Sequence, residues 1–409
     1  MASHCRFCAK PLTTSFADLG MSPLSNAYVA PENAKAMERF YPLHAYVCDG
    51  CHLVQLEEFE TPEAIFSDYL YFSSFAASWV EHARRYAAAM TERFGLTPAS
   101  RVVEVASNDG YLLQWFVQAG IPVLGVEPAA NVAEHARAKG VESVPAFFGE
   151  ATARELREKG FAADLMAANN VLAHVPDIRD FTRGFAVLLK PEGVATFEFP
   201  HLLQLMRHNQ FDTIYHEHFS YLSLLTAQQV MAAAGLRVFD VEELPTHGGS
   251  LRLYTCRAGA SHAGTPAIAR ILAEERAAGL DGMAAYAAFA RQVVDTKAAV
   301  LDFFVAAHRA GKRVVGYGAP AKGNTLLNYC GIGPEFLPFT VDRSPHKQGM
   351  LLPGTHIPIR APEAIFEAKP DYVFILPWNL ADEITRQMAG IRDWGGRFVV
   401  PIPRVTILP

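Results

Sequence analysis

The sequence predicts an α/β protein in which a small N-terminal module precedes two Rossmann-like units. Three observations support this fold class. Two Cys-x-x-Cys pairs stand in the first 51 residues, short apolar runs alternate with amphipathic helices from residue 100 onward, and a second strand–loop–helix unit begins at residue 312. Such alternation is typical of a mostly parallel sheet with helices on both faces.

The composition indicates a globular protein with no general affinity for polyanions. The chain has 409 residues, of which 50% are hydrophobic and 19% charged, so wholesale disorder is excluded. Its 36 Lys and Arg against 42 Asp and Glu give a net charge of −6, which disfavours nucleic-acid and membrane partners. No run approaches the roughly 18–20 apolar residues of a membrane span, and the N-terminus lacks an apolar signal segment. We therefore expect a cytoplasmic protein.

The N-terminal module, expected over residues 1–75, is built around Cys5-x-x-Cys8 and Cys48-x-x-Cys51. Two thiolates three residues apart on a tight turn can both lie about 2.3 Å from one Zn²⁺, and two such turns complete a tetrahedron. Because four thiolates leave no open coordination position, we predict one structural zinc ion. A redox Cys-x-x-Cys motif is the alternative.

The central domain, expected over residues 76–260, begins with a strand and a loop of distinctive composition. We predict strands at 101–105, 121–126, 141–145, 163–168 and 193–199 and helices at 111–119 and 131–139. The loop at 104–110 (EVASNDG) is not the G-x-G-x-x-G fingerprint of dinucleotide-binding folds. Its acidic start, small residues and closing glycine resemble the first motif of class I S-adenosylmethionine (SAM) methyltransferases, although Ala106 and Asn108 stand where glycines are commoner.

A carboxylate at the end of the second strand strengthens the cofactor prediction. Glu127 can accept hydrogen bonds from both ribose hydroxyls, a device that NAD-binding folds share. A solvated strand-end carboxylate is the structural alternative. The run at 169–177 follows the fourth strand and resembles the segment that covers the methionine end of SAM; we assign its His174 no catalytic role. The residues expected to bind SAM are Glu104, Ala106, Asn108, Gly110, Glu127 and Asn169.

An insertion expected at 200–224 concentrates groups suited to proton transfer. Residues 213–221 read TIYHEHFSY, with three ionisable groups between two tyrosines, directly beyond the edge of the predicted sheet. A histidine titrates near neutrality and, oriented by a carboxylate, can act as a general base. His216 and His218 are two residues apart, unlike the pair in H-E-x-x-H, which disfavours a metal site without eliminating it. An interior structural cluster is the other alternative.

The cysteine pairs, the SNDG loop at 107–110, the block at 213–221 and the HGGSLR run at 247–252 occur in the order seen in one family. Over essentially its whole length the chain resembles the SAM-dependent C-methyltransferases of nucleotide-linked 4-keto-deoxysugars. The resemblance implies a zinc module, a class I SAM methyltransferase (Rossmann-like) domain and a C-terminal Rossmann-like α/β domain. It also implies a nucleotide-sugar substrate, a base at His218, and active-site companions at Tyr215, Glu217 and Tyr69, with Tyr71 as an alternative to Tyr69.

The chemistry of carbon methylation fits these residues independently. A ring carbon becomes nucleophilic when an adjacent ketone lets its proton leave as an enolate, so the enzyme needs a base for the C–H and a donor for the enolate oxygen. We expect His218 to take the proton and Tyr215 or a neighbouring tyrosine to bind the oxygen. Glu217 would orient an imidazole or the substrate, Tyr221 would contact the substrate, and C3 is favoured over C5 as the acceptor.

A helical connection expected at 261–310 leads to a C-terminal lobe at 311–409. Its Gly-rich turn at 316–324 feeds a helix N-terminus, which is an anion-binding arrangement, and Lys322 adds a positive charge. Within the family this lobe resembles a domain that holds the sugar nucleotide, so we assign Lys322 and Asn324 to its pyrophosphate or nucleoside. A purely structural turn is the alternative.

Three other functions remain open from the sequence. An O- or N-methyltransferase acting on another small metabolite would bind SAM equally well, since the cofactor does not choose the acceptor atom. A zinc-ribbon RNA-binding or RNA-modifying protein is disfavoured by the acidic net charge. An oxidoreductase that uses Gly316 and Gly318 would bind a nicotinamide cofactor in place of SAM. The identity of the sugar, its carrier nucleotide and the oligomeric state are not determined by the sequence.

Overall fold

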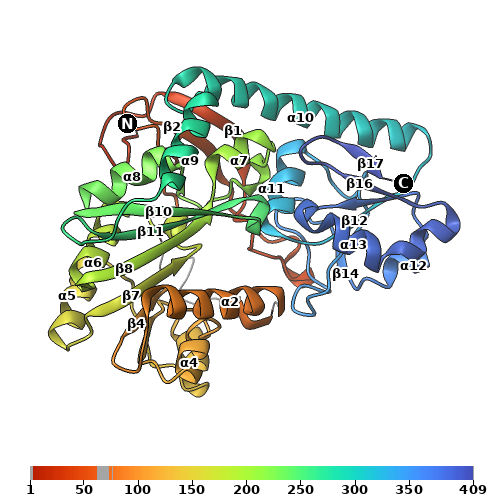
Figure 1. Cartoon of the computed structure of the whole chain (residues 1–409). Helices are drawn as coiled ribbons and strands as arrows, with labels where there is room; N and C mark the ends of the chain where they lie inside the picture. Colours follow the sequence, from red (N-terminus) through yellow and green to blue (C-terminus); the bar gives the residue numbers. More distant parts are fainter. Residues whose placement is uncertain (1–2, 62–72, 76, 409) are drawn as a thin grey trace.

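A computed structural model of the chain describes residues 3–61, 73–75 and 77–408. The described residues form three sheets, with strand orders β1-β2-β3-β9, β10-β11-β8-β7-β4-β5-β6 and β14-β13-β12-β15-β16-β17. Figure 1 shows the seven-stranded and six-stranded sheets in two separate lobes, with helix α10 (Met283–Arg309) running along one side of both. The predicted α/β class is confirmed.

The four-stranded sheet joins the N-terminal module to the predicted insertion. Its strands are β1 (Thr14–Ser22), β2 (Tyr41–Val47), β3 (Val54–Leu56) and β9 (Ser220–Tyr221). All neighbouring pairs are antiparallel. Alternate residues of β2 are buried, so one face of this sheet packs on the core, where Phe16 stacks on Phe289 of α10 at 4.7 Å between ring centroids. The N-terminal module is thus completed by a strand that begins two residues after His218.

The seven-stranded sheet is the central domain that the alternating pattern predicts. Its strands are β4 (Val102–Val105), β5 (Val123–Val126), β6 (Ser143–Val144), β7 (Ala163–Asn169), β8 (Leu189–Pro200), β10 (Leu236–Leu244) and β11 (Ser250–Arg257). Strands β4 to β8 pair in parallel, and β11 is antiparallel to both of its neighbours. The five strands expected from the sequence lie at the predicted places.

Helices cover both faces of this sheet. They are α2 (Ala77–Phe94), α3 (Leu113–Gln118), α4 (Ala130–Ala138), α5 (Glu150–Glu158), α6 (Ile178–Leu188), α8 (Leu224–Ala233) and α9 (Pro266–Ala277). Helix α7 (Leu202–Arg207) follows β8 and packs instead in the core that contains Phe16 of β1. Neighbouring residues of β4 enter different cores, since Val102 packs with Phe116 of α3 and Val103 with Phe181 of α6. A strand buried on both faces is mostly apolar, as Val102, Val103 and Val105 are in β4, while Glu104 is a buried exception.

The C-terminal lobe is a second, Rossmann-like α/β unit, as predicted. Its strands are β12 (Val314–Tyr317), β13 (Thr340–Val341), β14 (Ile359–Arg360), β15 (Tyr372–Ile375), β16 (Arg397–Val400) and β17 (Thr406–Leu408), with helices α11 (Ala321–Cys330), α12 (Ala364–Ala368) and α13 (Ala381–Gln387). All pairs but the last are parallel. None of the helices in the described part of the chain combines the length and the apolar character that a membrane crossing requires.

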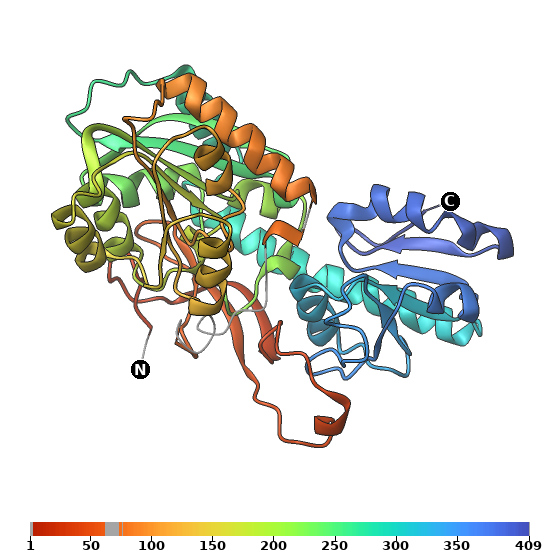
Figure 2. The same cartoon turned by 90° about the horizontal axis from the view of Figure 1, so that it is seen from below.

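A segment of the N-terminal module lies between the two lobes, as Figure 2 shows. Its Val29 forms a β-bridge with Leu351 of the C-terminal lobe. Farther along, Glu38 accepts a hydrogen bond from the Gly354 backbone N–H at 2.7 Å. Because the same segment also contacts the block at 213–221, the N-terminal module fixes the C-terminal lobe against the candidate catalytic residues.

Candidate active site

The four N-terminal cysteines lie in one cluster whose sulfur atoms are close enough to bind a single metal ion. Their sulfur atoms all lie within 4.8 Å of one another, with Cys5 and Cys51 at 3.5 Å and Cys8 and Cys48 at 3.4 Å. Four sulfurs bound to one Zn²⁺ at about 2.3 Å would be separated by roughly 3.8 Å, so the cluster fits this ion. The predicted zinc ligands are confirmed as a cluster.

Both Cys-x-x-Cys turns have the same backbone. Each is closed by a 2.9 Å hydrogen bond to the carbonyl of its first cysteine, from the N–H of Ala9 in one turn and of His52 in the other. Ala9 (φ 62°) and His52 (φ 59°) adopt the left-handed conformation, which bends the chain so that both sulfurs of a pair face the same point.

Arg6, inside the first cysteine turn, connects the zinc site to the central domain. Its guanidinium donates to the Pro176 carbonyl at 2.7 Å and to the Leu56 carbonyl, and lies 5.3 Å from the centre of the Phe219 ring. Pro176 lines the cavity described below, and Phe219 follows His218 in the chain. The zinc turns therefore support both the rim of the cavity and the candidate catalytic segment.

The loop after β4 has the backbone of a glycine-rich turn without most of the glycines. Ala106 (φ 56°), Asn108 (φ 48°) and Gly110 (φ 78°) are all left-handed. Asparagine tolerates this region better than most residues, and at Gly110 a Cβ would lie only 2.9 Å from Val141 Cγ2. The departures from glycine at 106 and 108 thus leave the conformation intact.

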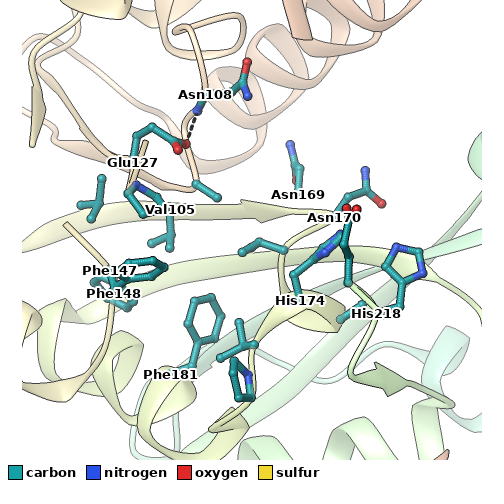
Figure 3. A pocket seen from close by; sticks show the side chains of 18 of the residues that line it. Val105, Asn108, Glu127, Phe147, Phe148, Asn169, Asn170, His174, Phe181 and His218 are labelled. Carbon is teal, nitrogen blue, oxygen red and sulfur yellow. Dashed lines mark hydrogen bonds between the residues drawn. The ribbon is translucent and has the colours of Figure 1, made fainter. Parts of the chain in front are cut away.

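A cavity of about 700 Å³ opens where this loop meets the carboxyl ends of the parallel strands. Figure 3 shows Phe147, Phe148 and Phe181 at one end, Glu127 beside the loop, and His218 at the other end. An apolar aromatic end, a carboxylate beside the loop and a polar end suit the adenine, ribose and methionine of SAM. The cavity also lies where ligands of open α/β sheets bind.

The structure brings four of the six predicted SAM residues to this cavity. Those that line it are Ala106, Asn108, Glu127 and Asn169. Glu104 does not line it; its side chain is buried under the loop, and burial raises the pKa of its carboxyl well above the usual value. Gly110 does not line it either, because it packs against Val141. Both act through the shape of the loop.

Glu127 fixes the loop and faces the cavity at once. Its Oε2 accepts the Asn108 backbone N–H at 2.9 Å and its Oε1 accepts the Ala129 backbone N–H at 3.0 Å. Burial raises the pKa of its carboxyl, while these two hydrogen bonds act in the opposite direction. Each carboxylate oxygen retains acceptor capacity for a ribose hydroxyl.

We expect Glu127→Ala to weaken SAM binding about 10²-fold, because hydrogen bonds to a charged group contribute about 1.5–3 kcal/mol each. Isothermal titration calorimetry measures the change. Glu134→Ala, at an exposed position of α4, is the matched control and should leave the affinity unchanged. Equal affinities of the two variants would remove Glu127 from the cofactor site.

The block at 213–221 places His218 at the polar end of the cavity. Its Nδ1 lies 3.0 Å from the Thr213 carbonyl, and its ring lies 4.0 Å from the Tyr215 ring and 4.6 Å from the His174 ring. Since a carbonyl only accepts, Nδ1 carries the hydrogen and the lone pair is on Nε2. Burial, reinforced by His174, holds the pKa of His218 well below the usual value, so the ring is neutral at pH 7.

The neighbours of His218 take different places. Tyr215 and Glu217 line the cavity, and Glu217 accepts a hydrogen bond from Asn26 at 2.7 Å. His216 turns toward the N-terminal sheet, where its Nε2 lies 3.2 Å from the Pro42 carbonyl. Tyr221 is buried in β9 and does not line the cavity, although its ring lies 6.1 Å from that of His218.

The metal alternative at this block finds no support in the residues that the structure describes. Within them, the group of three or more potential ligands close enough to share a metal ion is the cysteine cluster. His216 and His218 contact different backbone carbonyls, those of Pro42 and Thr213 respectively, so their rings do not face a common ion. Tyr69, the remaining predicted catalytic residue, and Tyr71 lie outside the described residues.

The two candidate residues of the C-terminal lobe do not line this cavity. Lys322 donates to Asn379 Oδ1 at 2.7 Å, and its Nζ lies 4.3 Å from the centre of the Trp378 ring. Asn324 is buried and donates to the Ser25 carbonyl at 2.6 Å. The structure thus uses Asn324 to hold the N-terminal segment.

The Gly-rich turn before α11 binds its own chain. Asp342, at the end of β13, accepts the Ala319 backbone N–H at 2.7 Å, and the Tyr28 hydroxyl donates to the Ala319 carbonyl at 2.6 Å. At Gly318 a Cβ would lie 2.4 Å from Pro377 Cδ. The backbone groups of Ala319 are thus already hydrogen-bonded within the chain, and Asp342 has a structural partner, which disfavours the nicotinamide alternative.

Among the cavity residues to which no functional role was assigned from the sequence are Trp79, His174 and His247. Burial lowers the pKa of both histidines to about 4, so each is neutral at pH 7. His247 is left-handed (φ 56°) in the HGGSLR run, and His174 is in the run after β7. Both runs were singled out as motifs in the sequence, and this was the sequence feature that could have pointed to these two histidines.

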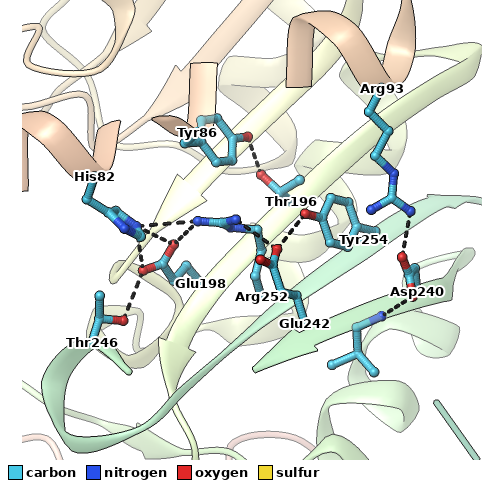
Figure 4. Close-up of polar contacts among 11 residues, drawn as sticks. His82, Tyr86, Arg93, Thr196, Glu198, Asp240, Glu242, Thr246, Arg252 and Tyr254 are labelled. Carbon is cyan, nitrogen blue, oxygen red and sulfur yellow. Dashed lines mark hydrogen bonds and ion pairs between the residues drawn. The ribbon is translucent and has the colours of Figure 1, made fainter. Parts of the chain in front are cut away.

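A buried ionic network holds two of these residues in place (Figure 4). Glu198 of β8, fully buried, accepts from Arg252 at 3.0 Å, from His82 at 3.1 Å and from Thr246 at 3.3 Å. The His82 ring stacks on Trp79 at 4.8 Å, and Thr246 precedes His247. The network therefore positions both Trp79 and His247.

Charge balance stabilises this network. Burial penalises the Arg252 charge, but Glu198 and Glu242 outweigh that effect and raise its pKa above the usual value. Glu242 accepts from Arg252 at 2.9 Å and from Tyr254 at 2.8 Å. Removing one partner would leave an uncompensated buried charge.

We expect Arg252→Met to lower the free energy of unfolding by about 3–5 kcal/mol, because Glu198 would lose its principal cation. The double variant Glu198→Gln, Arg252→Met removes both charges and should recover a large part of the loss. Chemical denaturation with guanidinium measures both. A single variant as stable as the wild-type protein would show that the network contributes no net stability.

Three family models match the chain in the order of its parts. A zinc binding domain model matches residues 5–66, a methyltransferase domain model matches 79–241, and a C-methyltransferase C-terminal domain model matches 245–403. The zinc model covers the cysteine cluster, and the methyltransferase model covers the loop after β4 and Glu127.

Relatives agree with these models. The C-methyltransferase NovU of Streptomyces niveus is 39% identical over 405 residues, covering 99% of this chain and 96% of that protein. The ubiquinone biosynthesis O-methyltransferase of Bartonella bacilliformis is 28% identical over 104 residues, covering 25% of this chain and 42% of that protein.

Solved structures were matched over about half of the chain. Magnesium protoporphyrin IX methyltransferase of Synechocystis PCC 6803 with bound SAM is 15% identical, with a TM-score of 0.34, covering 44% of this chain and 79% of that one. The 1,6-didemethyltoxoflavin-N1-methyltransferase of Burkholderia thailandensis is 19% identical, with a TM-score of 0.37, covering 50% and 94%. The full-length relative, the three domain models and the geometry of the cavity agree: the chain belongs to the SAM-dependent C-methyltransferases that carry an N-terminal zinc-binding domain.

Proposed function

We propose that this C-methyltransferase acts on a nucleotide-linked 4-keto-deoxysugar and methylates a ring carbon next to its ketone, C3 rather than C5. The observation that carries the proposal is the location of a neutral imidazole, His218, in the same cavity as the carboxylate Glu127. SAM bound at Glu127 and an acceptor bound at His218 would therefore occupy the same cavity. The family resemblance of the whole chain supports the choice of a nucleotide-linked sugar.

The proposed first step is loss of the proton next to the ketone. His218 takes that proton on Nε2, because its Nδ1–H is held by the Thr213 carbonyl. The electron pair of the C–H bond then forms the enolate double bond, and charge develops on the ketone oxygen. When bound, SAM supplies an electrophilic methyl group at this end of the cavity.

Three other side chains of the cavity are assigned to the substrate. Tyr215, whose ring lies 4.0 Å from the His218 ring, donates its hydroxyl to the developing oxyanion. His174 and His247 are neutral, so they hydrogen-bond to the sugar without adding charge. Tyr69 is retained as a proposed active-site tyrosine on the sequence resemblance alone.

The C-terminal lobe, which we assign to residues 311–409, is proposed to hold the sugar nucleotide. Lys322 is partly exposed beside Trp378 and near Asp212. A lysine at the start of α11 suits the negative charge of a pyrophosphate. Asn324 is proposed to shape this site indirectly, through its hydrogen bond to the Ser25 carbonyl.

The test is to incubate the protein with SAM and a panel of thymidine- and guanosine-linked 4-keto-deoxysugars. We expect mass spectrometry to show the gain of one methyl group on one of them, and nuclear magnetic resonance to locate it on a ring carbon next to the ketone. Methylation of a hydroxyl or amino group, or of none of the panel, would contradict the proposal.

A further inference from the structure

A residue of the N-terminal module reaches the candidate catalytic segment. Asn26, in the segment after β1, donates its Nδ2–H to Glu217 Oε1 at 2.7 Å, across 191 positions of sequence. The Asn26 side chain is exposed, whereas Glu217 is 6% exposed and lines the cavity. The contact therefore lies at the boundary between the cavity and the segment that separates the lobes.

The backbones at both ends of this contact are held by the same helix. Asn324 of α11 donates to the carbonyl of Ser25, the residue before Asn26, at 2.6 Å. Thr325, next in α11, donates its hydroxyl to the Ile214 carbonyl at 3.1 Å, at the start of the block that contains Glu217. The separation of Asn26 and Glu217 is thus set by α11.

The surroundings of Glu217 suit a neutral carboxyl group. Among the described residues, the hydrogen bond that reaches its carboxyl comes from the uncharged amide of Asn26, and no charged side chain contributes to the shift of its pKa. Burial raises the pKa of this carboxyl, and the Asn26 hydrogen bond lowers it by a smaller amount. A buried carboxylic acid beside an apolar or uncharged environment can donate a hydrogen bond at neutral pH.

We infer that Asn26 is a positioning residue that holds Glu217 with Oε1 as an acceptor and Oε2 facing the cavity as a hydrogen-bond donor to the ketone oxygen of the acceptor sugar. An amide N–H can meet only a lone pair, so the acid proton is confined to Oε2. As His218 takes the carbon-bound proton, the C–H pair forms the enolate double bond and the carbonyl pair moves onto oxygen. The negative charge on this oxygen is stabilised by a hydrogen bond from the O–H of the Glu217 carboxylic acid. The acid proton stays shared between the two oxygens until the ketone re-forms.

The inference rests on the proposed function and goes beyond it. It assigns the protonated form to Glu217 and the orientation of that carboxyl group to Asn26. The titratable groups around Glu217 are Tyr28 and His174, which is hydrogen-bonded to the Glu217 backbone, with His216 and His218 on either side in sequence. Burial is the main cause that raises the pKa of Tyr28, so its hydroxyl stays protonated near neutral pH.

The experiment follows exchange of the sugar's proton next to the ketone with deuterated solvent, as a function of pH, in the wild-type protein and in Asn26→Leu. Because the acid form of Glu217 is the active one, wild-type exchange should fall as pH rises through its pKa. Removing the amide donor raises that pKa further, so the alkaline fall should move to higher pH. The maximal rate should drop about tenfold, since the proton is no longer confined to Oε2.

Two variants keep the test independent of folding. Asn33→Leu, at an exposed position of the same N-terminal segment, is the matched control and should change neither rate nor pH profile. Glu217→Gln presents an amide N–H to the cavity in place of the acid, so its slower exchange should show no alkaline fall. Melting temperature and SAM affinity should be the same in Asn26→Leu and Asn33→Leu.

The outcomes separate the inference from the proposed function. A pH profile of Asn26→Leu that coincides with that of Asn33→Leu overturns the positioning role of Asn26. A loss of all exchange in a folded Glu217→Gln also overturns the inference, because it would show that exchange requires the ionised carboxylate of Glu217. Absence of exchange in the wild-type protein would instead overturn the proposed function on which the inference rests.

Discussion

His218→Asn should lower kcat for methyl transfer by about 10³-fold or more while leaving SAM affinity within about twofold, because general base catalysis contributes about 10²–10⁴-fold. An asparagine amide can still donate to the Thr213 carbonyl, which accepts from His218 Nδ1 in the wild-type protein. It cannot accept a proton from carbon, since an amide nitrogen has no basic lone pair. Steady-state kinetics and calorimetric titration of SAM measure the two quantities.

The neighbouring histidine provides the matched control for this prediction. His216 is in the same block, but its ring contacts the Pro42 carbonyl and does not line the cavity. His216→Asn should therefore retain kcat within about tenfold, as expected for loss of one hydrogen bond of about 1 kcal/mol. An equal loss of kcat in both variants would indicate damage to the segment and not the loss of a base.

Loss of zinc should destabilise the N-terminal module and, through it, lower the activity of the whole protein. Apparent binding free energies of structural zinc are about 10–16 kcal/mol, so Cys48→Ser should unfold the N-terminal module at ambient temperature. The consequences should reach the active site, because β3 pairs with β9 and Arg6 contacts both Pro176 and Phe219. We expect zinc content, melting temperature, SAM affinity and activity to fall together.

Cys256→Ala is the control for the zinc prediction, because Cys256 is a buried cysteine of β11 outside the cluster. It should retain one zinc ion per chain and wild-type activity, with a modest loss of stability from the small cavity. If protein stripped of zinc by a chelator keeps the melting temperature and kcat of the wild-type protein, the structural role of the metal is refuted.

The spacing of apolar residues and cysteines along the chain was sufficient to predict the strands of the central sheet and the metal-binding turns. The alternation of apolar runs and helices predicted a sheet covered on both faces, and the cysteine spacing predicted two turns that meet at one metal. The left-handed Ala106 shows the limit of such patterns, because the loop keeps its shape without the glycine that usually marks it. Glu104 and Gly110 were assigned to the cofactor from the resemblance of their loop to a SAM-binding motif, yet neither lines the cavity.

Features that depend on distant contacts could not be predicted in this way. Strand β9 has two residues and forms only because β3 supplies hydrogen-bond partners, so it carries no periodic signal of its own. His247 reaches the cavity through the network of Glu198 and Arg252, which joins α2, β8 and β11. The contact between Asn26 and Glu217 depends on α11, a helix of the other lobe.

The most direct measurement of the central claim is deuterium incorporation into the keto-sugar by protein loaded with S-adenosylhomocysteine, which carries no methyl group to transfer. We predict that the wild-type protein incorporates deuterium at one ring carbon next to the ketone and that His218→Asn does not. Absence of incorporation by the wild-type protein, or equal incorporation by the variant, would contradict proton abstraction by His218.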